Sequence, residues 1–169
     1  ISVIPTAMGD PLATCILRVT LGSIPQTSVD DAMCELIIFL DIDGVLVTPR
    51  TESDIIGDYA RFDSECVAAL NQLTNLTGAK LILSSSWRVG EDIGKLRTYF
   101  TSQRVTGELV DMTPIDPLSD REKEISDWLE TRPKRPRFVI LDDDPYFKEL
   151  ASFHILTNSQ SGLTDEDVE

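Results

Sequence analysis

The sequence has little of what membrane, zinc-binding or disulfide-rich proteins need. No apolar run approaches the roughly 20 residues that cross a bilayer, and the first residues lack the basic and apolar regions of a signal peptide. The three cysteines, Cys15, Cys34 and Cys66, are widely spaced and form no CxxC pair. The one histidine, His154, stands alone on an apolar segment, where we expect a structural role. These absences give no support to a zinc site and predict reduced, buried thiols in a cytoplasmic protein.

Basic residues are also scarce. The chain has 15 Lys and Arg against 29 Asp and Glu, a net charge of −14. Such a charge repels polyanions at long range, which excludes an extended nucleic-acid surface unless basic residues cluster. One cluster exists, Arg132–Arg137, but its two prolines favour a solvated linker. With 169 residues and 41% hydrophobic content, the chain has the composition of one soluble domain plus an extension.

Two regions differ in pattern. Residues 1–33 are poor in charge and form an N-terminal extension of unknown role, in which residues 17–21 alternate like an edge strand. From 34 to 169 the chain alternates strands with helices. We expect strands at 35–40, 79–83, 137–141 and 153–157, helices at 62–73, 92–100, 119–129 and 145–150, and an irregular stretch at 107–117. This order predicts an α/β fold of the Rossmann-like, three-layer type with a mainly parallel sheet.

Two carboxylates follow the first strand of this region. Asp41 and Asp43 lie two residues apart, and strand residues two apart point to the same side. Like charges that close repel unless a cation or a proton lies between them. Gly44 then allows a sharp turn that brings backbone N–H groups near a ligand. A divalent metal with a phosphate accounts for the pattern, and a solvated acidic turn is the alternative.

Two other strands end in polar residues. The three strand ends carry Asp41 and Asp43, Ser84 and Ser85, and Asp142 and Asp143. In open parallel α/β sheets ligands bind outside the carboxyl ends of the strands, so these side chains should meet at one edge. The combination favours the metal-phosphate site over the solvated turn.

At these positions the chain resembles the haloacid dehalogenase-like (HAD) superfamily of phosphotransferases. Asp41–Val45 matches its DxDG[T/V] motif, Ser84 its second motif and Asp142-Asp143 its acidic fourth motif. The basic third motif is matched by Arg121, with Lys123 as the rival, although the family more commonly uses Lys. Three further segments resemble a small capless group found in RNA-repair proteins: Ser86-Trp87-Arg88, Arg121–Ile125 and Gly162–Thr164.

The resemblance implies a division of roles around the strand ends. Asp41 is expected to attack phosphorus and form an aspartyl-phosphate, and Asp43 to act as general acid and then base. Mg²⁺ is expected on Asp41, the Asp43 backbone carbonyl and Asp142, with Asp143 either a ligand through water or an orienting group. Ser84, Ser85, Gly44 and Arg121 are the expected phosphate-binding residues.

Three further residues lie near the motifs. Arg88 either binds a second substrate group or packs structurally. We expect Trp87 to belong to the core rather than to a base-stacking platform. Asp144 is expected to cap the 145–150 helix.

The gaps between motifs leave no room for a large cap. About 40 residues separate Asp43 from Ser84 and about 33 separate Arg88 from Arg121, whereas a separate small domain needs roughly 40 to 50 of its own. An uncapped site suits a phosphate on a large substrate, either a nucleic-acid end or a phosphoprotein.

The sequence therefore predicts a Mg²⁺-dependent phosphomonoester hydrolase of unknown oligomeric state. The alternative is a catalytically silent HAD-like module that binds metal within a larger protein. The chain does not begin with Met, and it ends where the resembled family continues into a helix, so we expect a piece of a longer protein.

Overall fold

A five-stranded parallel sheet organises the computed structural model, which describes residues 35–118 and 120–168. The strand order is β5-β4-β1-β6-β7, and each neighbouring pair is parallel. The strands are β1 (Leu36–Leu40), β4 (Lys80–Leu83), β5 (Leu109–Met112), β6 (Arg137–Asp142) and β7 (His154–Leu156). The expected extension, its edge strand, Cys15 and Cys34 lie outside the described residues.

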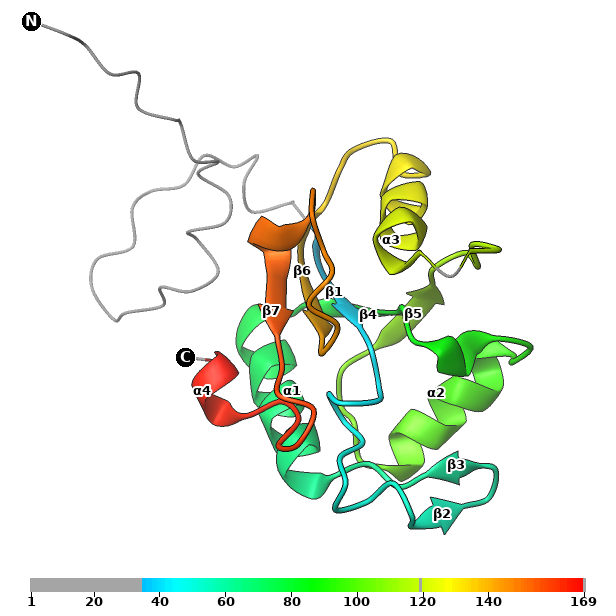
Figure 1. The fold of residues 1–169 in the computed structure, drawn as a ribbon, viewed down its shortest axis with the longest axis vertical. Coiled ribbons are helices and arrows are strands. Elements are labelled where there is room, and N and C mark those ends of the chain that lie inside the picture. The colour runs from blue at the N-terminus through cyan, green and yellow to red at the C-terminus, as the bar shows by residue number, and fades with distance from the viewer. Residues whose placement is uncertain (1–34, 119, 169) are drawn as a thin grey trace, which may run out of the picture.

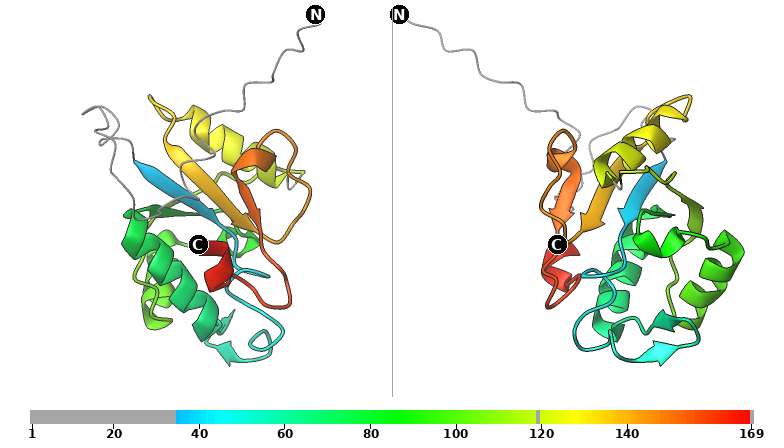
Figure 2. Two further views of the ribbon diagram at one scale, coloured as in Figure 1. Left: turned by 90° about the vertical axis from the view of Figure 1, so that its left-hand side faces the viewer. Right: turned by 45° about the vertical axis from the view of Figure 1, so that its right-hand side comes forward.

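Helices cover both faces of the sheet. Figures 1 and 2 show α1 (Ser64–Thr77) and α2 (Ile93–Ser102) on one face and α3 (Arg121–Glu130) on the other. The remaining elements are short: the antiparallel pair β2 (Ile55–Ile56) and β3 (Tyr59–Ala60), the 3₁₀ turns η3 (Ser86–Arg88) and η4 (Ala151–Phe153), and α4 (Asp165–Val168). The predicted three-layer α/β fold without a large cap is confirmed.

Strand β1 places apolar side chains on both faces of the sheet, so both faces must pack against helices. Its even residues, Ile38 and Leu40, enter the core cluster beneath α1 and α2. Its odd residues, Ile37 and Phe39, enter the cluster beneath α3, where Phe39 meets Trp128 edge-on with ring centroids 5.3 Å apart. A central parallel strand buried on both faces is apolar at every position, as this one is.

The three long helices each begin after an aspartate. The carboxylates of Asp63, Asp92 and Asp120 accept hydrogen bonds from backbone N–H groups in the first turn of α1, α2 and α3. Such caps satisfy donors that have no partner inside the helix. Helix α1 ends at Gly78, which adopts a φ of 68°. The predicted helices at 62–73, 92–100 and 119–129 are therefore confirmed, with α1 extended to Thr77.

The stretch 107–117 is not irregular throughout, because it contains the edge strand β5. Strand β5 contains a charged residue, Asp111, which is unusual among otherwise apolar strand residues. The Asp111 carboxylate accepts from Trp128 Nε1 at 2.9 Å and from Arg132 Nη2 at 2.7 Å. Arg97 covers the free edge by donating to two β5 carbonyl oxygens. Tertiary contacts thus make a strand from a sequence with weak strand character.

The predicted helix at 145–150 is wrong. Asp144 accepts from Tyr146 N at 3.0 Å and forms a local turn instead of a helix cap. The backbone N–H groups of Lys148 and Leu150 donate to Glu122 Oε1 of α3, at 3.0 and 2.7 Å. The segment is a loop tied to α3, because a side chain takes the donors that a helix would use.

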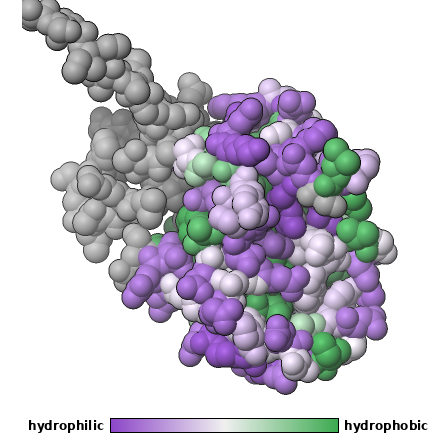
Figure 3. Space-filling view, viewed as in Figure 1, coloured by the Kyte–Doolittle hydropathy of each residue, from purple (hydrophilic) through white to green (hydrophobic). Residues whose placement is uncertain are grey.

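The surface is mainly polar. Figure 3 shows apolar side chains in small separate patches on one face. No helix among residues 35–118 and 120–168 is both long and apolar enough to span a membrane.

Segments near the C-terminal end brace the loop that follows β1. Thr157 Oγ1 donates to Gly44 O and Leu163 N donates to Val45 O, both at 2.9 Å. His154 Nε2 lies 2.9 Å from Asp142 O, consistent with a structural role. Cys66 is a free, buried thiol that donates to Ser161 O, and burial raises its pKa to about 11.

Gly162 allows this bracing segment to approach the β1 loop closely. A Cβ at Gly162 would lie 2.5 Å from Cys66 Sγ and 2.7 Å from Val45 O, at a φ of +68°. Gly57 has a similar φ of +66°, but nothing lies within 4 Å of its Cβ position. The two positions therefore differ in crowding, but both have a left-handed backbone that would strain an alanine.

We predict that Gly162→Ala destabilises the protein more than Gly57→Ala. Gly57→Ala should lower the free energy of unfolding by about 1–2 kcal/mol, the cost of a left-handed alanine. Gly162→Ala should add about 1–3 kcal/mol of overpacking. Urea denaturation of both variants measures the difference, and equal losses would contradict the close contact.

Candidate active site

The chemically useful side chains lie at the carboxyl ends of three adjacent strands. Asp41 follows β1, Ser84 follows β4 and Asp142 ends β6. Backbone hydrogen bonds extend to the site, since Asp41 N donates to Leu141 O and Ser84 N donates to Leu40 O, both at 2.9 Å. The sheet therefore fixes the relative positions of these residues, as the sequence predicts.

Three carboxylates converge there. Asp41, Asp142 and Asp143 each offer an oxygen, and these atoms lie within 4.8 Å of one another. Asp41 is 8% exposed and Asp142 only 1%. Burial, and next the charge of Asp41, raise the pKa of Asp142 to about 7. The same causes raise the pKa of Asp143. The triad is thus destabilised when all three groups are ionised and no cation is present.

Arg121, at the start of α3, supplies positive charge to the triad. Its Nη1 lies 3.4 Å from Asp41 Oδ1 and 3.6 Å from Asp142 Oδ2. The rival Lys123 has a side chain 53% exposed, which pairs with Asp116 and Asp127 away from the triad. Of the two candidates, the structure brings Arg121 to the site.

Unpartnered polar atoms gather at the same edge. Four buried side-chain polar atoms among the described residues have no hydrogen-bond partner, and three are Ser84 Oγ, Arg121 Nη1 and Asp142 Oδ2. Buried polar groups are rarely left unpaired, because their lost hydration costs free energy. A hydroxyl and a guanidinium suit an anion, and the carboxylates suit a hard divalent cation such as Mg²⁺. The residues therefore fit a metal together with a phosphate.

Gly44 contributes space rather than a free N–H group. Its N–H donates to Val47 O at 2.9 Å, so the expectation that this N–H faces a phosphate is not met. A Cβ at Gly44 would lie 2.2 Å from Asp143 Oδ2, and its φ is +69°. The glycine allows the Asp143 carboxylate to rest against the β1 loop.

Ser85 is occupied locally. Its Oγ accepts from Trp87 N at 3.4 Å, which caps η3. Among the serines expected to bind phosphate, Ser84 has the unpartnered hydroxyl.

The Asp43 carboxylate is bound by Trp87 and is not one of the three converging carboxylates. Trp87 Nε1 donates to Asp43 Oδ2 at 3.0 Å, and the Trp87 ring stacks on Tyr59 with centroids 5.2 Å apart. Desolvation of the carboxyl group raises the pKa of Asp43, the Trp87 hydrogen bond lowers it, and the Asp41 charge raises it, with a net rise. Trp87 belongs to an aromatic cluster, as expected, but it also positions a predicted catalytic carboxylate. The sequence feature that could have indicated this role is the position of Trp87 three residues after Ser84, at the end of the second strand.

Arg88 packs beneath the site. Its side chain is 3% exposed and pairs with Glu124, which also lies 3.7 Å from Arg121 Nε. The guanidinium donates to the carbonyl oxygens of Ser84, Ser85, Thr113 and Pro114. With its donors occupied, Arg88 fits the structural alternative and holds the turn that carries Ser84.

Comparison with known families agrees with this geometry. A family model described as the HAD domain in Swiss Army Knife RNA repair proteins matches residues 37–168. The chain belongs to this family. The search of curated proteins and that of solved structures gave no match. The predicted resemblance to a HAD domain of RNA-repair proteins is confirmed, and membership indicates a HAD-type, phosphatase-like activity.

We predict that Mg²⁺ stabilises the protein more as pH rises. The pKa of Asp142, about 7, exceeds its ordinary value of 3.8, so the folded state binds this proton more tightly than the unfolded state. Without metal, the free energy of unfolding should fall as pH rises from 3.8 to about 7 and then level off. A cation replaces the proton, so the increase in Tm on adding Mg²⁺ should grow over that interval.

Thermal melts in EDTA and in Mg²⁺ across this pH range measure both effects. Asp142→Asn is the control and should flatten the EDTA curve. An equally steep curve in that variant would contradict the role of Asp142.

Proposed function

We propose that the protein is a Mg²⁺-dependent phosphomonoester hydrolase that works through an aspartyl-phosphate on Asp41. The observation that carries the proposal is the set of buried atoms around Asp41 that make no hydrogen bond: Ser84 Oγ, Arg121 Nη1 and Asp142 Oδ2. A phosphate seated between Ser84 and Arg121 would lie next to the Asp41 carboxylate, the group best placed to attack it.

In the first half-reaction an Asp41 oxygen bonds to phosphorus as the bond from phosphorus to the leaving oxygen breaks. Asp43 donates its proton to that oxygen, and the raised pKa of Asp43 favours the protonated form that this step needs. Ser84 and Arg121 hold the other phosphate oxygens and balance their charge. The Trp87 hydrogen bond holds the Asp43 carboxylate in place for this proton transfer.

In the second half-reaction a water molecule attacks the phosphorus of the aspartyl-phosphate. Asp43, now ionised, accepts a proton from this water, and Asp41 leaves as a free carboxylate. Bound Mg²⁺, held by Asp41, Asp142 and Asp143, would neutralise charge on the phosphoryl group and on the attacking carboxylate.

The terminal phosphate of an RNA is the substrate we propose. Residues 35–118 and 120–168 place no large cap over the site, so a phosphate on a bulky molecule can enter. The family description names RNA repair, and the net charge of −14 disfavours a long nucleic-acid footprint without disfavouring a single end.

We predict Mg²⁺-dependent phosphate release that depends on Asp41 and Arg121. Asp41→Asn should abolish turnover, as should EDTA. Arg121→Met should lower kcat/KM by about 100- to 1,000-fold, the usual effect of losing one transition-state contact. Lys123→Met is the matched control from the same helix and should change kcat/KM by less than about threefold, because this exposed side chain makes surface ion pairs.

Phosphate release from terminally phosphorylated RNA and from an aryl phosphate measures these effects. Full activity in Asp41→Asn would exclude the proposed nucleophile. A protein that binds Mg²⁺ and hydrolyses no phosphate ester would instead be a silent metal-binding module.

A further inference from the structure

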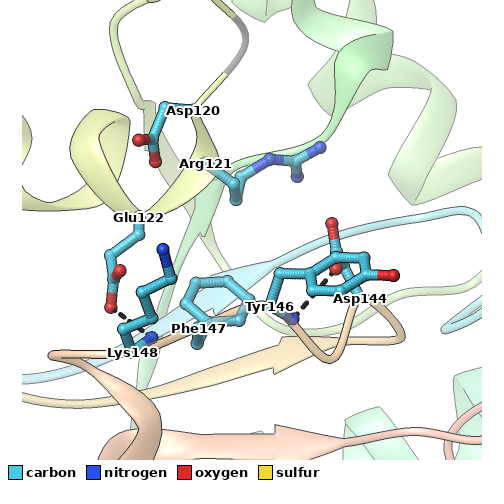
Figure 4. A pocket seen from close by; sticks show the side chains of 7 residues that line it. All are labelled: Asp120, Arg121, Glu122, Asp144, Tyr146, Phe147 and Lys148. Carbon is cyan, nitrogen blue, oxygen red and sulfur yellow. Dashed lines mark hydrogen bonds between the residues drawn. The ribbon is translucent and has the colours of Figure 1, made fainter.

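A cleft of about 420 Å³ lies beside the candidate active site, between the start of α3 and the loop that follows β6 (Figure 4). Its volume is in the range of pockets that hold small organic ligands. Neither the predicted catalytic steps nor the metal triad uses this space. Its walls are the first turn of α3 on one side and residues 144–148 on the other.

Arg121 connects the cleft to the reacting phosphate. The residue lines the cleft, and its Nη1 lies 3.4 Å from Asp41 Oδ1. A phosphate held by this guanidinium would lie beside the cleft, so the group attached to that phosphate can enter the cleft. The occupant of the cleft is then the part of the substrate that is covalently attached to the phosphate.

Tyr146 presents a flat aromatic surface in this cleft. The residue is 77% exposed, an unusual state for a large ring, and it lies at the same end of the cleft as the Arg121 guanidinium, on the opposite wall (Figure 4). Phe147, next to it, is only 9% exposed and packs against His154 with ring centroids 4.4 Å apart. One aromatic anchors the loop in the core, and the other remains free to stack on a ligand.

The wall that carries Tyr146 is fixed before any ligand binds. Glu122 Oε1 accepts from the N–H groups of Lys148 and Leu150, which ties the loop to α3. The Asp144 carboxylate accepts from Tyr146 N. A preorganised wall loses little conformational entropy on binding, which favours affinity.

We propose that this cleft binds the nucleoside that carries the terminal phosphate, with Tyr146 stacked on its base. The proposal rests on the hydrolase function proposed above and names the part of the substrate that the enzyme recognises. Every base has a π-face, so stacking on tyrosine selects a nucleotide without selecting its sequence.

The charges of the cleft favour one terminal nucleotide over a long polyanion. Asp120 and Asp144 on its rim repel phosphates, while their oxygens can accept hydrogen bonds from sugar hydroxyls or base amino groups. Lys148 lies across Phe147 from the Arg121 guanidinium (Figure 4) and can pair with the next phosphate of the strand.

The test compares kcat/KM for short RNAs ending in a 5′- or a 3′-phosphate with kcat/KM for glycerol phosphate, which has no base. The ratio of RNA to glycerol phosphate should fall about 10- to 100-fold in Tyr146→Ala, mainly through a higher KM. Tyr146→Phe keeps the ring and should keep the ratio. Leu76→Ala is a control of similar exposure, 72%, on α1 at the opposite face of the sheet, and should also keep it.

An unchanged ratio in Tyr146→Ala, with both substrates hydrolysed, overturns the cleft proposal and leaves the hydrolase function intact. A loss confined to a phosphoserine peptide also overturns it. If the wild type hydrolyses no phosphate ester, the hydrolase function fails, and fluorescence anisotropy with a phosphorylated trinucleotide tests the cleft separately. Weaker binding by Tyr146→Ala than by wild type then supports the cleft, and equal or absent binding overturns it.

Discussion

The mutual repulsion of Asp41, Asp142 and Asp143 is the constraint around which the described part of the chain is arranged. These carboxylates approach within 4.8 Å of one another in a largely buried place, an arrangement that opposes folding unless other forces fix it. The hydrogen-bonded strands β1, β4 and β6 fix it from the core side, and Arg121 offsets part of the charge. The contacts of Thr157, Leu163 and His154 brace the loops from outside. The folded protein therefore retains repulsion among these carboxylates, which a bound cation would reduce.

In the proposed mechanism the triad binds charge and Asp43 transfers the proton. Asp43 lies two residues from Asp41 in sequence, and the indole of Trp87 binds its carboxylate. The Tyr59–Trp87 stack ties that indole to the β2–β3 pair, so the small hairpin supports the position of the Asp43 carboxylate. On the other side, Arg88 and Glu124 link the Ser84 turn to Arg121. One ion network therefore connects Ser84 and Arg121, the two residues that we propose bind phosphate.

Much of this could be predicted from the sequence, because the main features depend on local pattern and on a general property of parallel sheets. A few neighbouring residues are enough to recognise the apolar run before Asp41, the aspartate caps and the polar strand ends. The missed features depend on distant partners. β5 needs Trp128 and Arg132 to hold Asp111, the 145–150 loop needs Glu122, and the task of Gly44 depends on Asp143, about 100 residues away.

The central claim is that Asp41 is the group that attacks phosphorus. The most direct measurement is to quench the protein during turnover of a phosphate ester with Mg²⁺, reduce the acyl phosphate with borohydride, and locate the modified residue by mass spectrometry. The account predicts a reduced side chain at position 41 that is absent when EDTA is added before the substrate. Modification at another residue, or rapid turnover with an unmodified Asp41, would contradict it.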